Sequence, residues 1–85
     1  SFDATSLFNR AVAGLSDKAT RGFMTDETLT LLRSECPGWD LYNLHAEFEG
    51  WVNADSSRTP ANWQRAFIGY VRRWHEKHRH ELRGG

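Results

Sequence analysis

The sequence predicts an all-α fold, a small single-domain bundle of about four helices that ends in a long, amphipathic, basic helix. Apolar residues recur at helical spacing in four segments, and capping signals precede three of them. No stretch of five or more residues alternates apolar and polar side chains, and no Asn-Gly or Asp-Gly pair marks a hairpin. The 85 residues include four tryptophans, five phenylalanines and two tyrosines, which suits one small aromatic core.

The first half of the chain predicts two helices. We expect one over residues 5–15, where apolar side chains recur at helical spacing. Thr25 is suited to cap a second helix, because the acidic Asp26 and Glu27 that follow it favour the positive end of the helix dipole. The Pro-Gly pair at 37–38 ends this second helix.

The second half predicts two longer helices. Asp40 is suited to cap a third helix, which we expect to end near Ala54. The apolar stripe of that helix consists of Leu41, Leu44, Phe48, Trp51 and Val52. Thr59 and Pro60 match an N-cap followed by a proline at the first helical position, so the fourth helix is expected to begin there and to run to Arg83. We expect these two helices to be antiparallel and to form the main core.

The fourth predicted helix carries aromatic rings on one side and guanidinium groups on the other. The rings that fall together at 3.6 residues per turn are Trp63, Phe67, Tyr70 and Trp74. Arg65, Arg72 and Arg79 fall on the opposite side, spaced about 10 Å apart by their seven-residue interval. We therefore assign the rings to the core and the arginines to phosphates, carboxylates or an acidic protein surface. Trp39 lies in the turn before the third helix, where it either plugs the bundle or joins a binding surface.

Charge is distributed unevenly although the formal sum is zero. Residues 1–56 hold four Lys or Arg against nine Asp or Glu, whereas residues 57–85 hold seven against two. No acidic residue occurs from Arg58 to Arg73. A merely solvated helix face usually mixes both signs, so this stretch favours contact with a polyanion such as DNA, although the pattern leaves the solvated alternative open. The predicted binding residues are Arg58, Arg65, Arg72, Arg73, Lys77 and Arg79.

The sequence lacks the motifs of catalytic, metal and membrane sites. His75 and His78 are three residues apart, unlike the His-Glu-x-x-His pair of zinc proteases, and adjacent cations oppose a metal ion. No glycine-rich phosphate loop or nucleophile elbow occurs, so we expect no enzymatic activity, cofactor or small-molecule substrate. The single cysteine, Cys36, fits a reducing compartment. Without an apolar run of about 18 residues or a leader, we expect a cytoplasmic location and no membrane partner.

A pattern of aromatic residues over about half of the chain resembles a known family. It comprises Cys-Pro-Gly-Trp-Asp-Leu-Tyr-Asn-Leu at 36–44, Glu-Phe-Glu-Gly-Trp at 47–51, Thr-Pro-Ala at 59–61 and Ala-Phe-Ile-Gly-Tyr-Val-Arg-Arg-Trp at 66–74. These segments resemble the C-terminal region of bacterial plasmid replication initiator proteins. They are more loosely similar to the helical C-terminal domains of phage replication proteins and of the primosomal DnaT type.

The resemblance implies a non-catalytic accessory module from the C-terminal part of a longer replication initiator. It would bind single-stranded or origin DNA, recruit the replicative helicase, or do both, through Arg65, Arg72, Arg73 and Trp39. The acidic first half would repel DNA, and the first 35 residues match no part of the pattern. An adaptor that docks an acidic protein without binding nucleic acid therefore stays open, as does a structural domain that orients or dimerises its neighbours.

Overall fold

The computed structural model describes residues 3–12 and 20–83, and within these ranges it contains helices and no strand. The predicted all-α bundle is therefore confirmed. The helices are α1 (Ala4–Val12), α3 (Asp26–Glu35), α4 (Leu41–Asn53) and α5 (Trp63–His78), with the 3-10 turns η1 (Ser56–Arg58) and η2 (Arg79–Arg83). None of the helices in these ranges combines the length and apolar composition needed to cross a bilayer.

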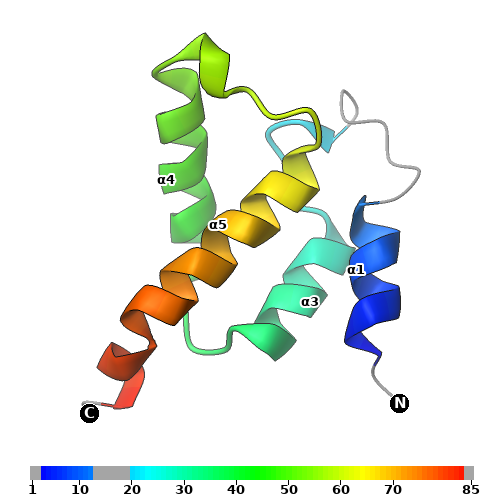
Figure 1. The fold of residues 1–85 in the computed structure, drawn as a ribbon, viewed down its shortest axis with the longest axis vertical. Coiled ribbons are helices and arrows are strands. Elements are labelled where there is room, and N and C mark those ends of the chain that lie inside the picture. Colours follow the sequence, from blue (N-terminus) through cyan, green and yellow to red (C-terminus); the bar gives the residue numbers. More distant parts are fainter. Residues whose placement is uncertain (1–2, 13–19, 84–85) are drawn as a thin grey trace.

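Helix α5 occupies the middle of the bundle. Figure 1 shows α5 running diagonally across the molecule, with α4 on one side and α1 and α3 on the other. The chain runs along α4 and α5 in opposite directions, as expected, and the two helices cross. However, α5 contacts each of the other three helices, and α1 also packs against α3. The core is therefore built around α5 from both sides, and not by the last two helices alone.

The caps of α3 and α4 confirm the predicted starts of these helices. The Thr25 side chain accepts a hydrogen bond from the backbone N–H of Thr28, and the Asp40 carboxylate accepts one from the N–H of Asn43. Each bond satisfies a backbone donor that the first turn of a helix leaves open. The second predicted helix ends before the Pro-Gly pair, and the third ends at Asn53, one residue before the predicted end.

Helix α1 begins slightly earlier than predicted. The Asp3 carboxylate accepts hydrogen bonds from the N–H groups of Thr5 and Ser6, at 3.1 and 3.2 Å, so the helix starts at Ala4. The predicted end at Leu15 lies outside the described residues.

The predicted boundaries of the last helix are wrong at both ends. Its N-cap is Asn62, whose Oδ1 accepts from the N–H of Arg65 at 3.0 Å, and not Thr59. The Asn62 side chain also donates to the carbonyl of Val12 at 3.0 Å, a tertiary bond that fixes the cap at this position. At the other end the α-helix stops at His78 and tightens into a 3-10 turn, so no continuous α-helix reaches Arg83.

Apolar side chains from all four helices make up the core. The buried members are Leu7, Ala11, Leu31, Leu32, Cys36, Leu41, Leu44, Phe48, Val52, Trp63, Phe67, Ile68 and Val71. Two of the four rings predicted for the core face of α5, Trp63 and Phe67, are buried, whereas Tyr70 and Trp74 are only partly so. Trp51 was assigned to the apolar stripe of α4, yet 52% of its surface is exposed. That prediction is wrong, and it leaves a large ring at the surface.

Candidate nucleic-acid interface

Helix α5 separates the predicted basic residues into two surfaces. Helical geometry places Arg65 and Arg72 on one side of α5, with Arg79 just beyond the end of the helix in η2, and places Arg73 and Lys77 on the side that carries Tyr70. Arg58 lies in η1, immediately after α4. The two surfaces differ in what surrounds the cations.

Arg72, the middle member of the first surface, is neutralised within the fold. Its Nε and a terminal nitrogen donate to the two carboxylate oxygens of Glu35 at 2.9 and 3.0 Å. Its guanidinium also lies 5.0 Å from the centre of the Phe8 ring. This fork-shaped pairing ties α5 to α3 and α1, and it interrupts the row of guanidinium groups predicted from the seven-residue spacing.

Replacing Arg72 with alanine is expected to lower the free energy of unfolding by about 1 kcal/mol, the upper range for a partly exposed ion pair. The matched control is Arg65→Ala, which removes an exposed arginine that makes no ion pair with a described residue and should change stability by less than about 0.5 kcal/mol. Urea denaturation followed by circular dichroism measures both. Equal effects would show that the Glu35 contact contributes nothing specific.

Arg58 and Trp51 form a cation–aromatic pair at the end of α4. The Arg58 guanidinium lies 4.7 Å from the centre of the Trp51 ring and donates to the Trp51 carbonyl at 3.0 Å. Its Nε is 3.9 Å from Asp55, a long contact between exposed groups that neutralises little of its charge. The pair therefore presents a cation and an aromatic ring together at the surface.

A shallow groove runs between this pair and α5. One hollow of about 300 Å³ is lined by Trp51, Tyr70 and Arg73. A neighbouring hollow of about 210 Å³ shares Tyr70 and Arg73 and is extended by Trp74, Lys77 and His78. We call the two together the α4–α5 groove. Buried Phe48 lies beneath, with its ring centre 6.5 Å from that of Trp51 and 5.3 Å from that of Tyr70.

The charges around the groove are mainly positive. Arg73 and Lys77 make no ion pair with any residue in the described part of the chain. Burial, followed by the nearby charge of Glu47, raises the pKa of Tyr70, so its phenol is a neutral donor at physiological pH. Glu47 accepts a hydrogen bond from the side chain of Asn43 at 3.2 Å. An anionic ligand is therefore favoured along α5 and disfavoured near Glu47.

Trp74 lines the groove with an indole ring whose N–H makes no hydrogen bond to a described residue. Its indole ring lies 4.0 Å, centre to centre, from the imidazole of His78. Its Nε1 is buried and has no hydrogen-bond acceptor among the described residues. Buried donors usually have a partner, so this part of the groove is incompletely satisfied in the isolated chain.

Besides Arg72, three of the predicted binding residues lie away from the groove. Trp39 is half-buried and donates from Nε1 to His75 Nδ1 at 2.9 Å. This bond ties the turn before α4 to the last turns of α5. Arg79 follows the last turn of α5 in a separate pocket beside the turn between α3 and α4. Arg65 lies in the first turn of α5 and lines a separate hollow together with Pro60.

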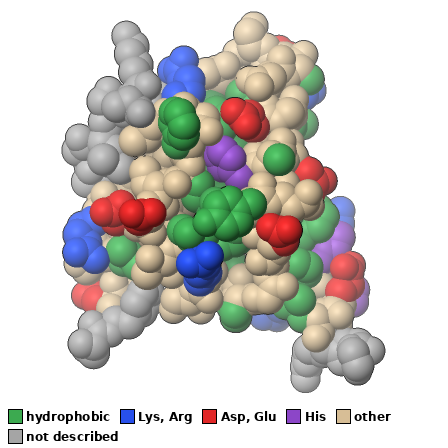
Figure 2. All heavy atoms as spheres, turned by 180° about the vertical axis from the view of Figure 1, so that it is seen from behind, with side chains coloured by type: hydrophobic (Ala, Val, Ile, Leu, Met, Phe, Trp, Pro, Cys, Tyr) green, Lys and Arg blue, Asp and Glu red, His purple; other side chains and the backbone are tan. Residues whose placement is uncertain are grey.

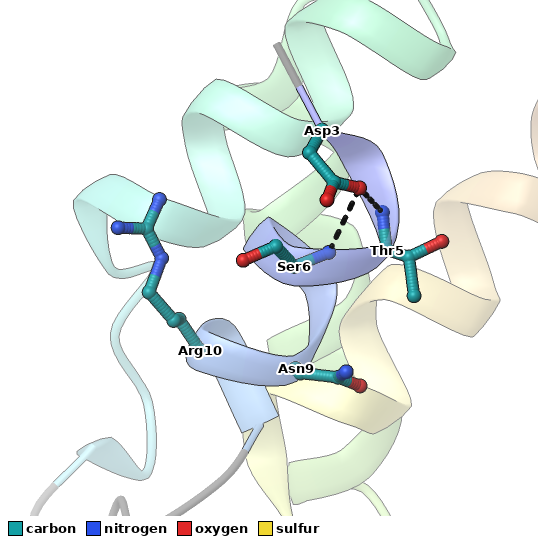
Figure 3. Close-up of a pocket in the computed structure, with 5 residues that line it drawn as sticks. All are labelled: Asp3, Thr5, Ser6, Asn9 and Arg10. Atoms are coloured by element: carbon teal, nitrogen blue, oxygen red, sulfur yellow. Dashed lines mark hydrogen bonds between the residues drawn. The ribbon is translucent and has the colours of Figure 1, made fainter.

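Among the described residues, the other hollows and surfaces do not combine aromatic rings with charges of one sign. A hollow of about 530 Å³ lies along α1 and is lined by Asp3, Thr5, Ser6, Asn9 and Arg10. Figure 3 shows Asp3 engaged in capping, with Arg10 and Thr5 pointing to opposite sides of the helix. The face turned away in Figure 1 carries exposed apolar side chains with basic and acidic ones interspersed (Figure 2). Neither surface collects charges of one sign around an aromatic ring.

The groups that would support metal or thiol chemistry are dispersed or protonated. No three His, Cys, Asp or Glu side chains of residues 3–12 and 20–83 are close enough to hold a metal ion together. His78 Nδ1 instead contacts the Glu81 carboxylate at 2.8 Å. Burial raises the pKa of Cys36, so the thiol stays protonated.

The structure thus joins Arg58, Arg73 and Lys77 around two rings, Trp51 and Tyr70, that sequence reasoning had assigned to the core. One signal could have indicated them, because both fall at the edge of the apolar stripe of their helix. An edge position carries a ring that is buried on one face and exposed on the other.

No family model, curated protein or solved structure matches this chain.

Proposed function

We propose that this chain is a non-catalytic domain that binds single-stranded DNA in the α4–α5 groove, as an accessory module of a replication initiator. The observation that carries the proposal is the groove itself, where exposed Trp51 and partly buried Tyr70 adjoin Arg73 and Lys77. Single-strand binding proteins combine such rings, on which unstacked bases lie, with cations that follow the phosphates. The role in replication initiation rests on the family resemblance.

The groove favours single strands over duplex. Bases in a duplex are stacked on one another, so exposed rings such as Trp51 give duplex binding little benefit. Glu47 on α4 repels phosphates, so the backbone of the strand is expected to follow Arg73 and Lys77 on α5, with bases turned toward α4. The buried ring of Phe48 keeps Trp51 and Tyr70 in place.

The small number of cations sets the expected strength and salt dependence. Arg58, Arg73 and Lys77 together would neutralise three phosphates. The slope of log affinity against log salt should therefore be about −2, at about −0.7 per phosphate on a single strand. Each base stacked on a ring adds about 1 to 3 kcal/mol, with little sequence preference.

The test is a titration of a fluorescent oligothymidine at two salt concentrations. The double variant Arg73→Gln/Lys77→Gln is expected to reduce the slope by about 1.4, corresponding to two phosphates. Trp51→Phe should keep the slope and weaken binding through poorer stacking. The matched control, Arg10→Gln/Arg33→Gln, removes two exposed arginines from α1 and α3 and should bind as the unchanged chain does. No binding, or an equal loss in the control, would remove the proposal.

An adaptor function is the second candidate, because the groove also carries the residue types that dominate protein interfaces. Trp51, Tyr70 and two arginines lie together there, and tryptophan, tyrosine and arginine are enriched among residues that contribute most to binding. An adaptor predicts capture of the replicative helicase without binding of oligonucleotides. The capture should then be lost in Arg73→Gln/Lys77→Gln and kept in the Arg10→Gln/Arg33→Gln control.

A further inference from the structure

Figure 1 shows the end of α5 beside the turn between α3 and α4, and a separate pocket is lined by residues of these two segments. We call it the C-terminal pocket; its volume is about 480 Å³, and it is lined by Pro37, His75, Arg79, His80 and Leu82. It shares no lining residue with the α4–α5 groove. No carboxylate is among these lining residues, and the polar side chains of the pocket are one arginine and two histidines, each of which can donate a hydrogen bond.

The wall of the pocket is fixed by packing between the turn and η2. Gly38 has a φ of +99°, a left-handed conformation that side chains rarely adopt. A Cβ placed there would lie only 3.1 Å from each terminal methyl of Leu82. The absence of a side chain therefore lets Leu82 close onto the turn, which shapes the apolar wall with Pro37.

His75 is held in one tautomer by Trp39. The indole N–H of Trp39 donates to Nδ1 of His75 at 2.9 Å, and the two rings pack edge to face at 6.3 Å. Trp39 is itself packed edge to face against Trp74, at 6.2 Å. Because Nδ1 must accept, the neutral imidazole carries its proton on Nε2. The remaining polar atom of His75 is therefore a donor.

Arg79 supplies a permanent positive charge that the fold neutralises weakly. Its nearest carboxylate is that of Glu76 at 3.7 Å, and the two side chains are 61% and 73% exposed. An exposed pair at this distance contributes little, so the guanidinium can turn to another anion. His80 adds a third nitrogen-bearing side chain, 4.0 Å from Glu81.

We propose that the C-terminal pocket binds a phosphate group, either free or as a monoester of a small organic molecule. The phosphate oxygens would accept from the Arg79 guanidinium, from His75 Nε2–H and from His80. A tetrahedral oxyanion offers enough acceptors for three separate donors, and arginine matches its geometry well. Pro37 and Leu82 would contact the apolar part of a monoester. The site is independent of the DNA groove, because Arg73 and Lys77 do not contribute to it.

The experiment is an NMR titration of the histidine side-chain nitrogens in the full chain. Inorganic phosphate and adenosine 5′-monophosphate are added separately at neutral pH. We expect a saturable shift of His75 Nε2, at least about fivefold weaker in Arg79→Gln because the charge-assisted bonds are lost. Arg65→Gln, which removes an exposed arginine in the first turn of α5, should leave the affinity unchanged. Tighter binding of the nucleotide would identify a monoester as ligand, and equal binding would identify the phosphate alone.

A second variant tests the role of the tautomer. Trp39→Phe keeps an aromatic ring against α5 but removes the donor to His75, so the imidazole is no longer held with its proton on Nε2. Phosphate affinity should fall by about twofold or more, because part of the population then presents an acceptor. The proposal is overturned if no saturable shift occurs, or if Arg79→Gln and Arg65→Gln bind equally. Neither result would bear on the binding of oligothymidine.

Discussion

Replacing Gln64 with leucine is expected to lower the free energy of unfolding by roughly 2 to 5 kcal/mol, since each buried polar group left unsatisfied costs about 1 to 3 kcal/mol. Gln64 is fully buried in the first turn of α5. Leucine has a similar volume, so the change removes hydrogen bonds without leaving a large cavity. The stability change therefore reports the polar contacts alone.

These contacts join the start of α3 and the chain before it to the start of α5. The Gln64 Oε1 accepts from the Thr28 hydroxyl at 2.7 Å and from the Thr25 N–H at 3.2 Å. Its Nε2 donates to the carbonyls of Phe23 and Thr20, at 2.7 and 3.3 Å. One side chain thus satisfies several main-chain groups that lie 39 to 44 residues away in sequence.

Urea denaturation of Gln64→Leu, Thr28→Val and the double variant measures this network. Thr28→Val removes only one donor to Gln64 and should cost less, about 1 to 2 kcal/mol. The double variant should cost less than the sum of the single changes, because both share the same bond. If Gln64→Leu changes stability by less than about 0.5 kcal/mol, the buried amide does not organise this region.

The helix starts show why part of the fold could be predicted from sequence. Thr25 and Asp40 cap their helices through bonds that span three residues, so the local sequence contains all the information. Asn62 also makes a local cap, but its bond to Val12 spans 50 residues. Thr59 followed by Pro60 carries the stronger local signal, and the tertiary contact decides against it.

The site was harder to predict because its features depend on distant partners. A helical wheel shows that Arg65, Arg72 and Arg79 share a side, but not that Glu35 lies opposite the middle one. Likewise the sequence cannot show that Arg58 returns to cover Trp51 once η1 reverses the chain. A pattern along one helix thus identifies the cations, whereas packing between helices decides which of them remain available.

Stability is also expected to fall as the pH decreases from about 7 to 5, the range in which histidines gain a proton. Trp63 donates from Nε1 to His45 Nε2 at 2.9 Å, which joins the start of α5 to α4. The bond from Trp39 to His75 holds the other end of α5. A protonated imidazole has no acceptor, so protonation of His45 removes its bond from Trp63.

The pKa of His45 gives the sign of this effect. Burial lowers the pKa of His45 below its ordinary value of 6.5, although the nearby charge of Glu49 opposes the shift. Because the unfolded chain takes up the proton more readily, the stabilisation by neutral His45 is complete above the ordinary pKa. It is lost as the pH falls from that value through the lower pKa of His45 in the folded state. Asp55 and Glu81 have lowered pKa values, held down mainly by hydrogen bonds from Ser57 and His78, and so titrate below this range.

Substitutions at His45 separate its contribution to the loss of stability in acid from the contributions of the other histidines. His45→Ala should cost roughly 1 to 3 kcal/mol at neutral pH, because the buried indole of Trp63 loses this acceptor. His45→Gln supplies an amide oxygen that does not titrate, so it should keep more of the stability and flatten the decline between about pH 7 and 5. His80→Gln, at an exposed position, is the matched control and should retain the full decline. Denaturant unfolding at three pH values measures all three, and an unchanged decline in His45→Gln would show that His45 does not set the acid sensitivity.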